Sequence, residues 1–387
     1  MEIDKIMTFL CPTKLIMGIN AHKQLKEIIA HFKVDHLFFL ADHGVASTET
    51  YQIIEDILQE NHVPFDLFTD IEPDPSDKTV EKAYNVYKTG KAPVLLALGG
   101  GSTMDVGKAV AILATNGGRI HDYEGFDKFS IPPLPLIAVP TTAGTGSEVS
   151  AVCSITDTVR NLKMSIRSAP LNPAKVAILD PIVLRTLPMI AAIHAGMDAF
   201  IHALESYLSL QANAITDAGN ICAIELISHN IRPFVADRDN LDAGLKMLCA
   251  ASMGAMGFSN TGAGNVHCMA RFVSAFFHIP HGLATAVCLP YAAEFNLMAS
   301  PEKFARVALA MGENTQGLTT EDAACKALQA IKRLCKDLHI PETLSNLGVT
   351  KEKIPEMARL AYEANYNRWN PRYTTEDDFL ALFKKAF

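Results

Sequence analysis

Short apolar runs alternate with longer stretches of helical spacing over roughly the first 180 residues of the chain. The apolar runs are compact, and several end in Gly, Pro or Asp, which is typical of buried β-strands. Segments such as ETYQIIEDILQENH between them are amphipathic. Strands that alternate with helices predict a mainly parallel sheet covered by helices on both faces. The predicted strands are 36–42, 64–70, 92–100, 134–140 and 174–180.

The pattern changes after Asp180 and Pro181. From about residue 190 to the end, the chain is rich in Ala, Leu and Met at helical spacing, and no segment has a convincing strand pattern. We therefore predict an α/β domain at 1–182 and an all-helical domain at 183–387. A chain of 387 residues is long enough for two such domains with separate cores.

Composition narrows the function classes. The net charge of −8 argues against nucleic acid or an anionic membrane as the main partner. The N-terminus lacks the basic start and long apolar run of a signal peptide, and the apolar runs are too short to span a bilayer. The eight cysteines are scattered singly, which fits buried thiols in a reducing compartment. We expect a cytoplasmic protein that acts on small molecules.

A glycine-rich turn at 99–102 lies between a predicted strand and a predicted helix. Glycines let a phosphate approach backbone amides, and a helix N-terminus adds a favourable partial charge. The sequence GGGS matches neither GxGxxG nor a Walker loop, so an ordinary tight turn explains it equally well. Asp105, in the first helical turn, is placed to cap amides or to accept from a ribose hydroxyl.

A second polar loop, PTTAGTGSE at 140–148, follows the next predicted strand and offers the hydroxyls of three threonines and a serine. Two polar loops at the carboxyl ends of strands mark the edge where α/β sheets bind ligands. Asp42 ends the strand at 36–42, where a carboxylate accepts from adenosine ribose hydroxyls and repels a 2′-phosphate. That favours NAD over NADP, although a solvated residue is the alternative for Asp42.

Four residues offer the chemistry of a metal site. Asp198 and His202 lie four apart in GMDAFIHALESYLS, so a helix puts them on one face. His267 and His281 lie in GNVHCMARFVSAFFHIPHG. One carboxylate and three imidazoles suit zinc, iron, manganese or cobalt.

Spacing alone leaves this ligand set open. His194 lies four residues before Asp198, and His278 lies three residues before His281, so other sets are possible. A lone helical histidine is also more often a satisfied core residue than a ligand. The residues by themselves therefore do not fix the choice.

Over essentially its whole length, the chain resembles the iron-containing (group III) alcohol dehydrogenase family. The matching motifs, in order, are GGGSTMDVGK, VPTTAGTGSEV, AILDP followed by LP, GMDAFIHALESY, GNVHCMA, IPHG followed by LP, and NPR. The resemblance implies a dehydroquinate synthase-like fold with an N-terminal dinucleotide-binding domain, a helical C-terminal domain and an active site in the cleft between them. It also implies a dimer.

The resemblance implies site residues and chemistry as well. The family's metal ligands, one Asp and three His, fall on Asp198, His202, His267 and His281, and no ligand position falls on His194 or His278. The implied NAD contacts are Asp42, Gly100, Gly101, Ser102, Asp105, Thr141, Thr142, Thr145 and Lys163; without the resemblance, Lys163 would be taken for a surface lysine. Iron(II) is the usual metal of the family, and zinc also suits these ligands. The implied reaction is hydride transfer with the metal polarising an alcohol or carbonyl oxygen.

The chain departs from the family beside the third ligand. Many relatives carry a second His four residues later, where this chain has Arg271. A guanidinium there could bind an anionic substrate group through paired hydrogen bonds. Arg368 and Trp369 stand just before NPR, where relatives often have small residues that line the pocket. Phe258 is a candidate apolar wall.

These residues favour a small primary alcohol or aldehyde with an anionic group, and reduction of sulfoacetaldehyde to isethionate is the preferred reaction. The alternatives are a general short-chain alcohol, a 1,3-propanediol or lactaldehyde-type substrate, and 4-hydroxybutyrate. Arg271 could instead bind a cofactor phosphate or a helix end, and Arg368 could be solvated. A glycerol dehydrogenase-type or dehydroquinate-synthase-like enzyme is a neighbouring alternative, and a non-catalytic assembly protein is the alternative of a different class.

Overall fold

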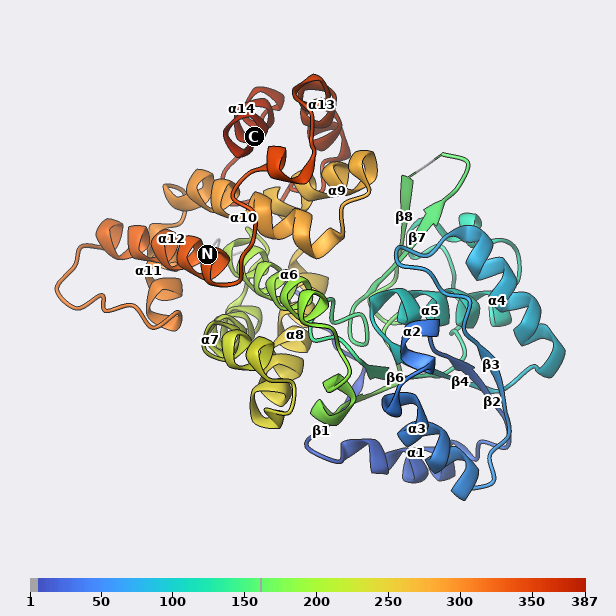
Figure 1. Cartoon of the computed structure of the whole chain (residues 1–387). Coiled ribbons are helices and arrows are strands. Elements are labelled where there is room, and N and C mark those ends of the chain that lie inside the picture. The colour runs from blue at the N-terminus through green and yellow to red at the C-terminus, as the bar shows by residue number, and fades with distance from the viewer. Residues whose placement is uncertain (1–5, 161) are drawn as a thin grey trace. The chain divides into compact units, whose positions relative to one another are not determined.

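The computed structural model describes residues 6–160 and 162–387 of the chain (Figure 1). Their contacts form two compact units. The α/β unit contains Leu10–Pro188 and Asp237–Ser252, and the helical unit contains Met189–Ala236 and Met253–Phe387 with the described residues before Leu10. The domain division between residues 182 and 183 stays a prediction.

A parallel six-stranded sheet forms the centre of the α/β unit, in the order β1-β9-β6-β4-β2-β3. The five apolar runs predicted as strands are confirmed as β2, β3, β4, β6 and β9. The edge strand β1 was not predicted, because it begins with an exposed lysine and none of its four residues is fully buried, so it forms no distinct apolar run. The strands are β1 (Lys14–Met17), β2 (Leu37–Leu40), β3 (Phe65–Phe68), β4 (Val94–Gly99), β6 (Leu136–Pro140) and β9 (Val176–Leu179).

Helices cover both faces of this sheet, as predicted (Figure 1). Phe39 stacks on Tyr51 of α3, whereas the adjacent Phe38 contacts Tyr87 of α4, because successive strand residues point to opposite faces. Every residue of β4 is buried, as expected for a strand covered on both sides. The helices of this unit are α1 (Leu25–Phe32), α2 (His43–Ala46), α3 (Glu49–Glu60), α4 (Asp77–Gly90) and α5 (Gly101–Asn116).

A second sheet of three strands, which was not predicted, packs on α4 and α5. It consists of β5 (Gly125–Phe126), β7 (Val152–Asp157) and β8 (Leu162–Arg167), with β7 and β8 antiparallel. In β7, buried residues alternate with partly exposed ones, and the polar positions between them hide the strand from a search for continuous apolar runs. This sheet places Lys163 in the α/β unit.

The described part of the helical unit contains helices and no strand, which confirms the predicted class of the C-terminal region. All residues from 196 to 208 of α6 are buried, so every polar side chain in that stretch needs a partner inside the protein. The helices are α6 (Met189–Leu208), α7 (Ala214–Ala236), α8 (Leu241–Thr261, which begins in the α/β unit), α9 (Asn265–Phe277), α10 (His281–Leu297), α11 (Pro301–Ala310), α12 (Thr320–Asp337), α13 (Ile354–Ala364) and α14 (Glu376–Ala386).

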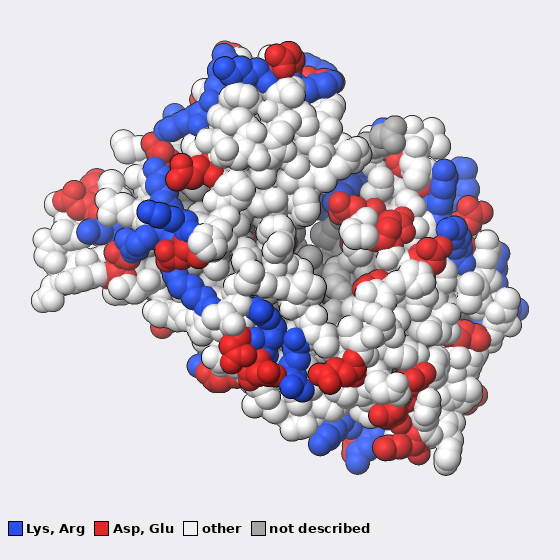
Figure 2. All heavy atoms as spheres, viewed as in Figure 1, with Lys and Arg blue, Asp and Glu red and all other residues white. Residues whose placement is uncertain are grey.

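Two further features bear on partners. Within the described residues, no helix combines the length and apolar content that crossing a membrane requires. The face of the molecule in Figure 2 carries basic and acidic side chains close to one another. Such mixing weakens the long-range field that would attract a polyanion.

Candidate metal and cofactor sites

Helix α6 carries Asp198, His202 and Glu205 on one face, at positions i, i+4 and i+7. All three residues are buried, with 3%, 6% and 5% of their surfaces exposed. Charged groups at this depth are unfavourable unless they are paired or ligate an ion. The structure supplies partners from α9 and α10.

His267 of α9 and His281 of α10 face Asp198. The Nε2 atoms of both histidines lie 3.8 Å from Asp198 Oδ1, and one ligand atom from each of the three residues lies within 4.8 Å of the others. His202 lies beside this group, with Nδ1 3.9 Å from Asp198 Oδ2 and its ring stacked on that of His267 at 4.9 Å. Ligand atoms of a tetrahedral zinc site lie about 3.3 Å apart, so the three donors need little movement to share an ion.

The hydrogen bonding and charge of these donor atoms also suit a cation. His267 Nε2 is buried and has no hydrogen-bond partner among the described residues. Burial by itself would raise the pKa of Asp198, but the three histidines outweigh burial and lower it. Asp198 is therefore an anion at neutral pH, held beside a ring nitrogen that has no hydrogen-bond partner among the described residues.

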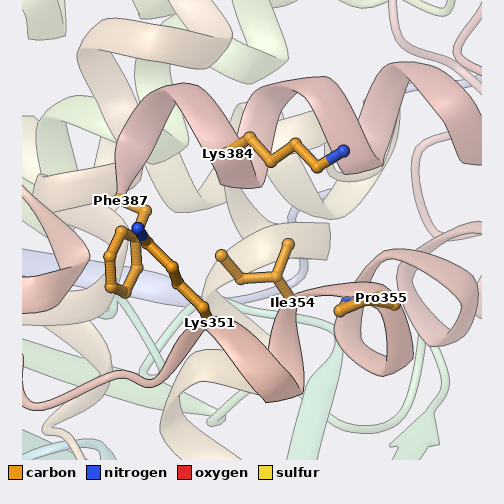
Figure 3. Close-up of a pocket in the computed structure, with 5 residues that line it drawn as sticks. All are labelled: Lys351, Ile354, Pro355, Lys384 and Phe387. Atoms are coloured by element: carbon orange, nitrogen blue, oxygen red, sulfur yellow. The ribbon is translucent and has the colours of Figure 1, made fainter.

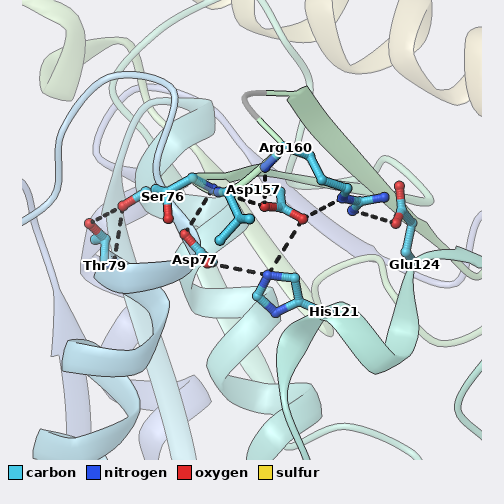
Figure 4. Close-up of polar contacts among 9 residues, drawn as sticks. Ser76, Asp77, Thr79, His121, Glu124, Asp157 and Arg160 are labelled. Carbon is cyan, nitrogen blue, oxygen red and sulfur yellow. Dashed lines mark hydrogen bonds and ion pairs between the residues drawn. The ribbon is translucent and has the colours of Figure 1, made fainter.

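A rival group of metal-binding side chains, Asp77, His121 and Asp157, lies in the α/β unit (Figure 4). His121 Nε2 is 3.2 Å from Asp77 Oδ2 and 3.7 Å from Asp157 Oδ2. Arg160 Nε lies 2.5 Å from Asp157 Oδ2, and the same guanidinium contacts Glu124 at 2.7 Å. The arginine already supplies positive charge, so this group is the weaker candidate for a metal.

The two histidines that compete by spacing have other surroundings. Neither His194 nor His278 belongs to either group of metal-binding side chains within 6–160 and 162–387. Burial lowers the pKa of His194. His278 is the C-cap of α9, with a left-handed backbone at φ 53°.

Glu205 is a site residue that the sequence analysis did not select. Its Oε2 lies 2.6 Å from His267 Nδ1. A signal was present, because Glu205 continues the helical face of Asp198 and His202. The contact itself joins residues 62 positions apart, which no local pattern reveals.

The predicted cofactor residues of the α/β unit, except Lys163 in β8, follow the carboxyl ends of β2, β4 and β6, which are neighbours in the sheet. After β2 the chain continues to α3, and after β4 it continues to α5, so the chain takes different directions from these two adjacent strands. Parallel α/β sheets bind ligands at such points. Asp42 follows β2, caps α2 by accepting from Val45 N at 3.0 Å, and accepts from Thr103 Oγ1 at 3.4 Å.

The glycine turn and the threonine loop lie against each other. A Cβ on Gly101 would be 2.9 Å from Thr145 Cγ2, and one on Gly100 would be 3.3 Å from Thr142 Cγ2. The glycines therefore permit a close approach of two loops. This packing requirement exists in addition to any contact with a phosphate.

Two of the predicted cofactor residues form hydrogen bonds within the loops. The carboxylate of Asp105 accepts from Ser147 Oγ at 2.8 Å and from Ser154 N at 3.0 Å, and burial raises its pKa. Thr141 is buried, and its N–H donates to Gly99 O at 3.0 Å. Both residues hold the second polar loop against the start of α5.

Asp74 connects two other predicted cofactor residues and was missed by the sequence analysis. Lys163 Nζ donates to Asp74 Oδ1 at 2.5 Å, and Ser102 Oγ accepts from Asp74 N at 3.3 Å. Asp74 has a left-handed backbone at φ 55°, so it belongs to a turn whose geometry the sequence alone does not specify.

The predicted substrate residues lie in the helical unit. The ring of Phe258 is 4.7 Å from that of His202 and 5.4 Å from that of His267, so it forms an apolar neighbour of the metal group. Arg271 lies one turn after His267 on α9, and its guanidinium is 4.5 Å from the ring centre of Tyr366.

Arg368 and Trp369 lie together before the NPR motif. The exposed Arg368 has its guanidinium 5.3 Å from the ring of Trp369. Buried asparagines hold this segment, because Asn370 Nδ2 donates to Asn296 Oδ1 at 2.7 Å and Asn367 Nδ2 donates to Asn265 Oδ1 at 2.8 Å. Asn265 begins α9, so the segment is tied to the helix that carries His267.

A separate cavity of about 150 Å³ in the helical unit lies between α13 and α14 (Figure 3). None of the predicted site residues lines it. Its walls are the side chains of Lys351, Ile354, Pro355, Lys384 and Phe387.

Comparison with known proteins identifies the class. Residues 12–181 match the family described as iron-containing alcohol dehydrogenase, and residues 192–387 match the C-terminal part of the Fe-containing alcohol dehydrogenase family. The chain belongs to this family and is an alcohol dehydrogenase, an oxidoreductase. The alternative of a non-catalytic assembly protein thereby loses its support.

The relatives differ in substrate. The chain is 37% identical to 1,3-propanediol dehydrogenase of Klebsiella pneumoniae over 385 residues, covering 99% of each. It is 34% identical to sulfoacetaldehyde reductase of Bilophila wadsworthia over 378 residues, covering 97% of each. It also resembles the crystal structure of sulfoacetaldehyde reductase from Bifidobacterium kashiwanohense in complex with NAD+, with a TM-score of 0.88, 27% identity and 99% of both chains covered.

Proposed function

We propose that the protein is an NAD(H)-dependent alcohol dehydrogenase and aldehyde reductase. It binds one divalent metal, preferably iron(II), through Asp198, His202, His267 and His281. The observation that carries the proposal is the group of donors around the buried Asp198, with His267 Nε2 lacking a hydrogen-bond partner among the described residues. When bound, the metal would act as a Lewis acid on the substrate oxygen, while the nicotinamide would accept or donate the hydride.

The cofactor part of the proposal rests on the loops after β2, β4 and β6. Asp42 offers a carboxylate to ribose hydroxyls, and the start of α5 at Gly100 and Gly101 offers backbone amides to a diphosphate. The other proposed contacts are Ser102, Asp105, Thr141, Thr142, Thr145 and Lys163. A family relative in complex with NAD+ supports the choice of cofactor.

The metal assignment is tested by purifying the protein anaerobically and measuring bound metal in the wild type and in His267→Ala. We expect His267→Ala to bind metal much more weakly through the three remaining ligands and to lose activity. The matched control is His278→Ala, which removes a histidine that caps the same helix. Full metal occupancy and full activity in His267→Ala would rule out the assignment.

We further propose a small primary alcohol or aldehyde with an anionic group as substrate, and sulfoacetaldehyde in particular. Arg271 carries this proposal, because it lies one helical turn beyond His267 and its guanidinium packs on Tyr366, which restricts its motion. The 34% identical sulfoacetaldehyde reductase supports it. An uncharged diol is the second candidate, favoured by the 37% identical 1,3-propanediol dehydrogenase.

The two candidates are separated by kcat/KM for sulfoacetaldehyde, succinic semialdehyde and propanal in the wild type and in Arg271→Ala. An anionic substrate predicts that Arg271→Ala loses far more activity on the two anions than on propanal. Arg372→Ala is the matched control, because its guanidinium also lies on a ring, 3.9 Å from the centre of Phe295. Equal losses on all three aldehydes would contradict the anionic substrate.

A further inference from the structure

Glu205 lies behind the candidate metal group and is surrounded by N–H donors. Its Oε2 accepts from Gly264 N at 2.9 Å and lies 2.6 Å from His267 Nδ1. Its Oε1 accepts from Val266 N at 2.6 Å. All three donors belong to the first turn of α9 or to the residue before it. Because only 5% of Glu205 is exposed, solvent contributes little to its hydrogen bonding.

The backbone is shaped to receive this carboxylate. Gly264 is the N-cap of α9, and a Cβ there would be 2.7 Å from Glu205 Oε1 and 3.1 Å from Asn370 Oδ1. Glycine at this position therefore lets the carboxylate reach the helix end. A negative charge at a helix N-terminus is favourable, so Glu205 caps α9 as well as contacting His267.

The same contact determines which nitrogen of His267 carries the proton. An ionised carboxylate can only accept, so the proton of a neutral His267 lies on Nδ1. The lone pair is then on Nε2, which faces Asp198 Oδ1 at 3.8 Å and lacks a hydrogen-bond partner among the described residues. A metal-binding imidazole needs its lone pair on the nitrogen that faces the ion.

We propose that Glu205 is a positioning residue that fixes the tautomer and the ring orientation of His267, so that Nε2 can bind the metal. The inference rests on the proposed metal site and goes beyond it, because Glu205 acts on the metal through His267, which it contacts directly and holds at the start of α9. Carboxylates that hold a ligating histidine in this way commonly change metal affinity by about 10–100-fold when they are replaced.

The test is Glu205→Gln. The amide can still accept one backbone N–H, but its NH2 group competes with the Nδ1–H of His267 and favours the tautomer with the proton on Nε2. We expect Zn2+ to bind about 10–100-fold more weakly, measured by competition with a chelator. In the metal-free protein labelled with [15N]histidine, the Nε2 resonance of His267, assigned with His267→Ala, should move toward the protonated position.

The chain offers a matched control in Asp180→Asn. Asp180 Oδ2 accepts from His22 N at 2.9 Å and lies 2.5 Å from His22 Nδ1, while Oδ1 accepts from Ile182 N at 3.0 Å. This buried carboxylate has the same kinds of donor as Glu205 but lies in the α/β unit. Asp180→Asn should therefore leave Zn2+ affinity and the His267 resonance unchanged.

A double-mutant cycle separates positioning from a general structural role. In the His267→Ala background, adding Glu205→Gln should cause no further loss of Zn2+ affinity, since the residue through which Glu205 acts is gone. A further loss equal to that in the wild type would overturn the inference. If Glu205→Gln does not fold, Glu205→Asp, which keeps the charge but is one methylene shorter, is measured in the same way.

The experiments distinguish a failure of the proposed metal site from a failure of the inference about Glu205. A wild-type protein that binds no Zn2+ overturns the proposed metal site, and this inference with it. A wild-type protein that binds Zn2+ while Glu205→Gln binds equally tightly overturns the inference alone and leaves the metal site standing.

Discussion

Gly282, directly after the candidate ligand His281, allows α10 to begin against α6. A Cβ at this position would lie 2.4 Å from the carbonyl oxygen of His194 and 2.8 Å from its carbonyl carbon. Both are backbone atoms, so rotation of a side chain cannot relieve the clash. Ordinary contact begins at 3.4 Å. Gly282→Ala therefore requires a displacement of about 1 Å (3.4 − 2.4) between the two helices, since packed interiors do not absorb such overlap.

The change in the free energy of unfolding caused by Gly282→Ala follows from two opposing effects. Overpacking typically costs about 1–3 kcal/mol, and alanine gains up to about 1 kcal/mol over glycine in a helix. We expect a net loss of up to about 3 kcal/mol in the free energy of unfolding. Because Asp198 lies on α6 and His281 on α10, the displacement also disturbs the 3.8 Å approach of Nε2 to Oδ1. We expect metal affinity to fall about 10–100-fold.

The assay combines urea unfolding with Zn2+ binding by chelator competition. The control is Gly219→Ala in α7, because a Cβ there meets nothing within 4 Å. It should gain up to about 1 kcal/mol of stability and bind Zn2+ like the wild type. The reasoning would be refuted if Gly282→Ala were as stable as Gly219→Ala and bound Zn2+ with wild-type affinity.

Three further substitutions test other parts of the molecule. Hydrogen bonds from the backbone and side chain of Arg160 lower the pKa of Asp157 to about 2. The resulting stabilisation is fully present above the pKa of Asp157 in the unfolded chain and is lost as the pH falls through about 2. Asp157→Asn should therefore lower the melting temperature at pH 7 but not near pH 2. Asn370→Ala leaves buried amide partners unsatisfied and should cost about 2–4 kcal/mol in urea unfolding; a cost below 1 kcal/mol would contradict the role of these hydrogen bonds. Gly101→Ala pushes against Thr145 and should weaken NADH binding about tenfold in a fluorescence titration, whereas unchanged affinity would count against the proposed cofactor loops.

Four of the five strands that the sequence predicted share one physical property. Most residues of β2, β4, β6 and β9 are buried on both faces, which produces a continuous apolar run. The small sheet is different: Ile155 and Met164 face a core, but the residues on either side of each one in its strand are polar and partly exposed. The mixed sequence pattern of these strands can be interpreted only when their packing against α4 and α5 is known.

The site residues likewise fall into those that the sequence predicted and those that it missed. The proposed metal ligands were selected through motifs, and the structure brings Asp198, His267 and His281 together. Glu205 and Asp74 were missed because their roles depend on partners far away in sequence. Asp74, for example, becomes relevant only when Ser102 and Lys163 are folded against it, 28 and 89 residues away.

Glu205 links the order of a helix end to the holding of an ion. The N–H groups of Gly264 and Val266 and the ring of His267 share its carboxylate, so fraying of the first turn of α9 would free the histidine as well. By thermodynamic linkage, an ion that binds only the ordered turn stabilises that turn in proportion to the logarithm of its free concentration. At the proposed metal site, metal release and local opening at 264–267 would therefore be coupled. The lifetime of the active enzyme in a metal-poor solution would then depend on how often this turn opens.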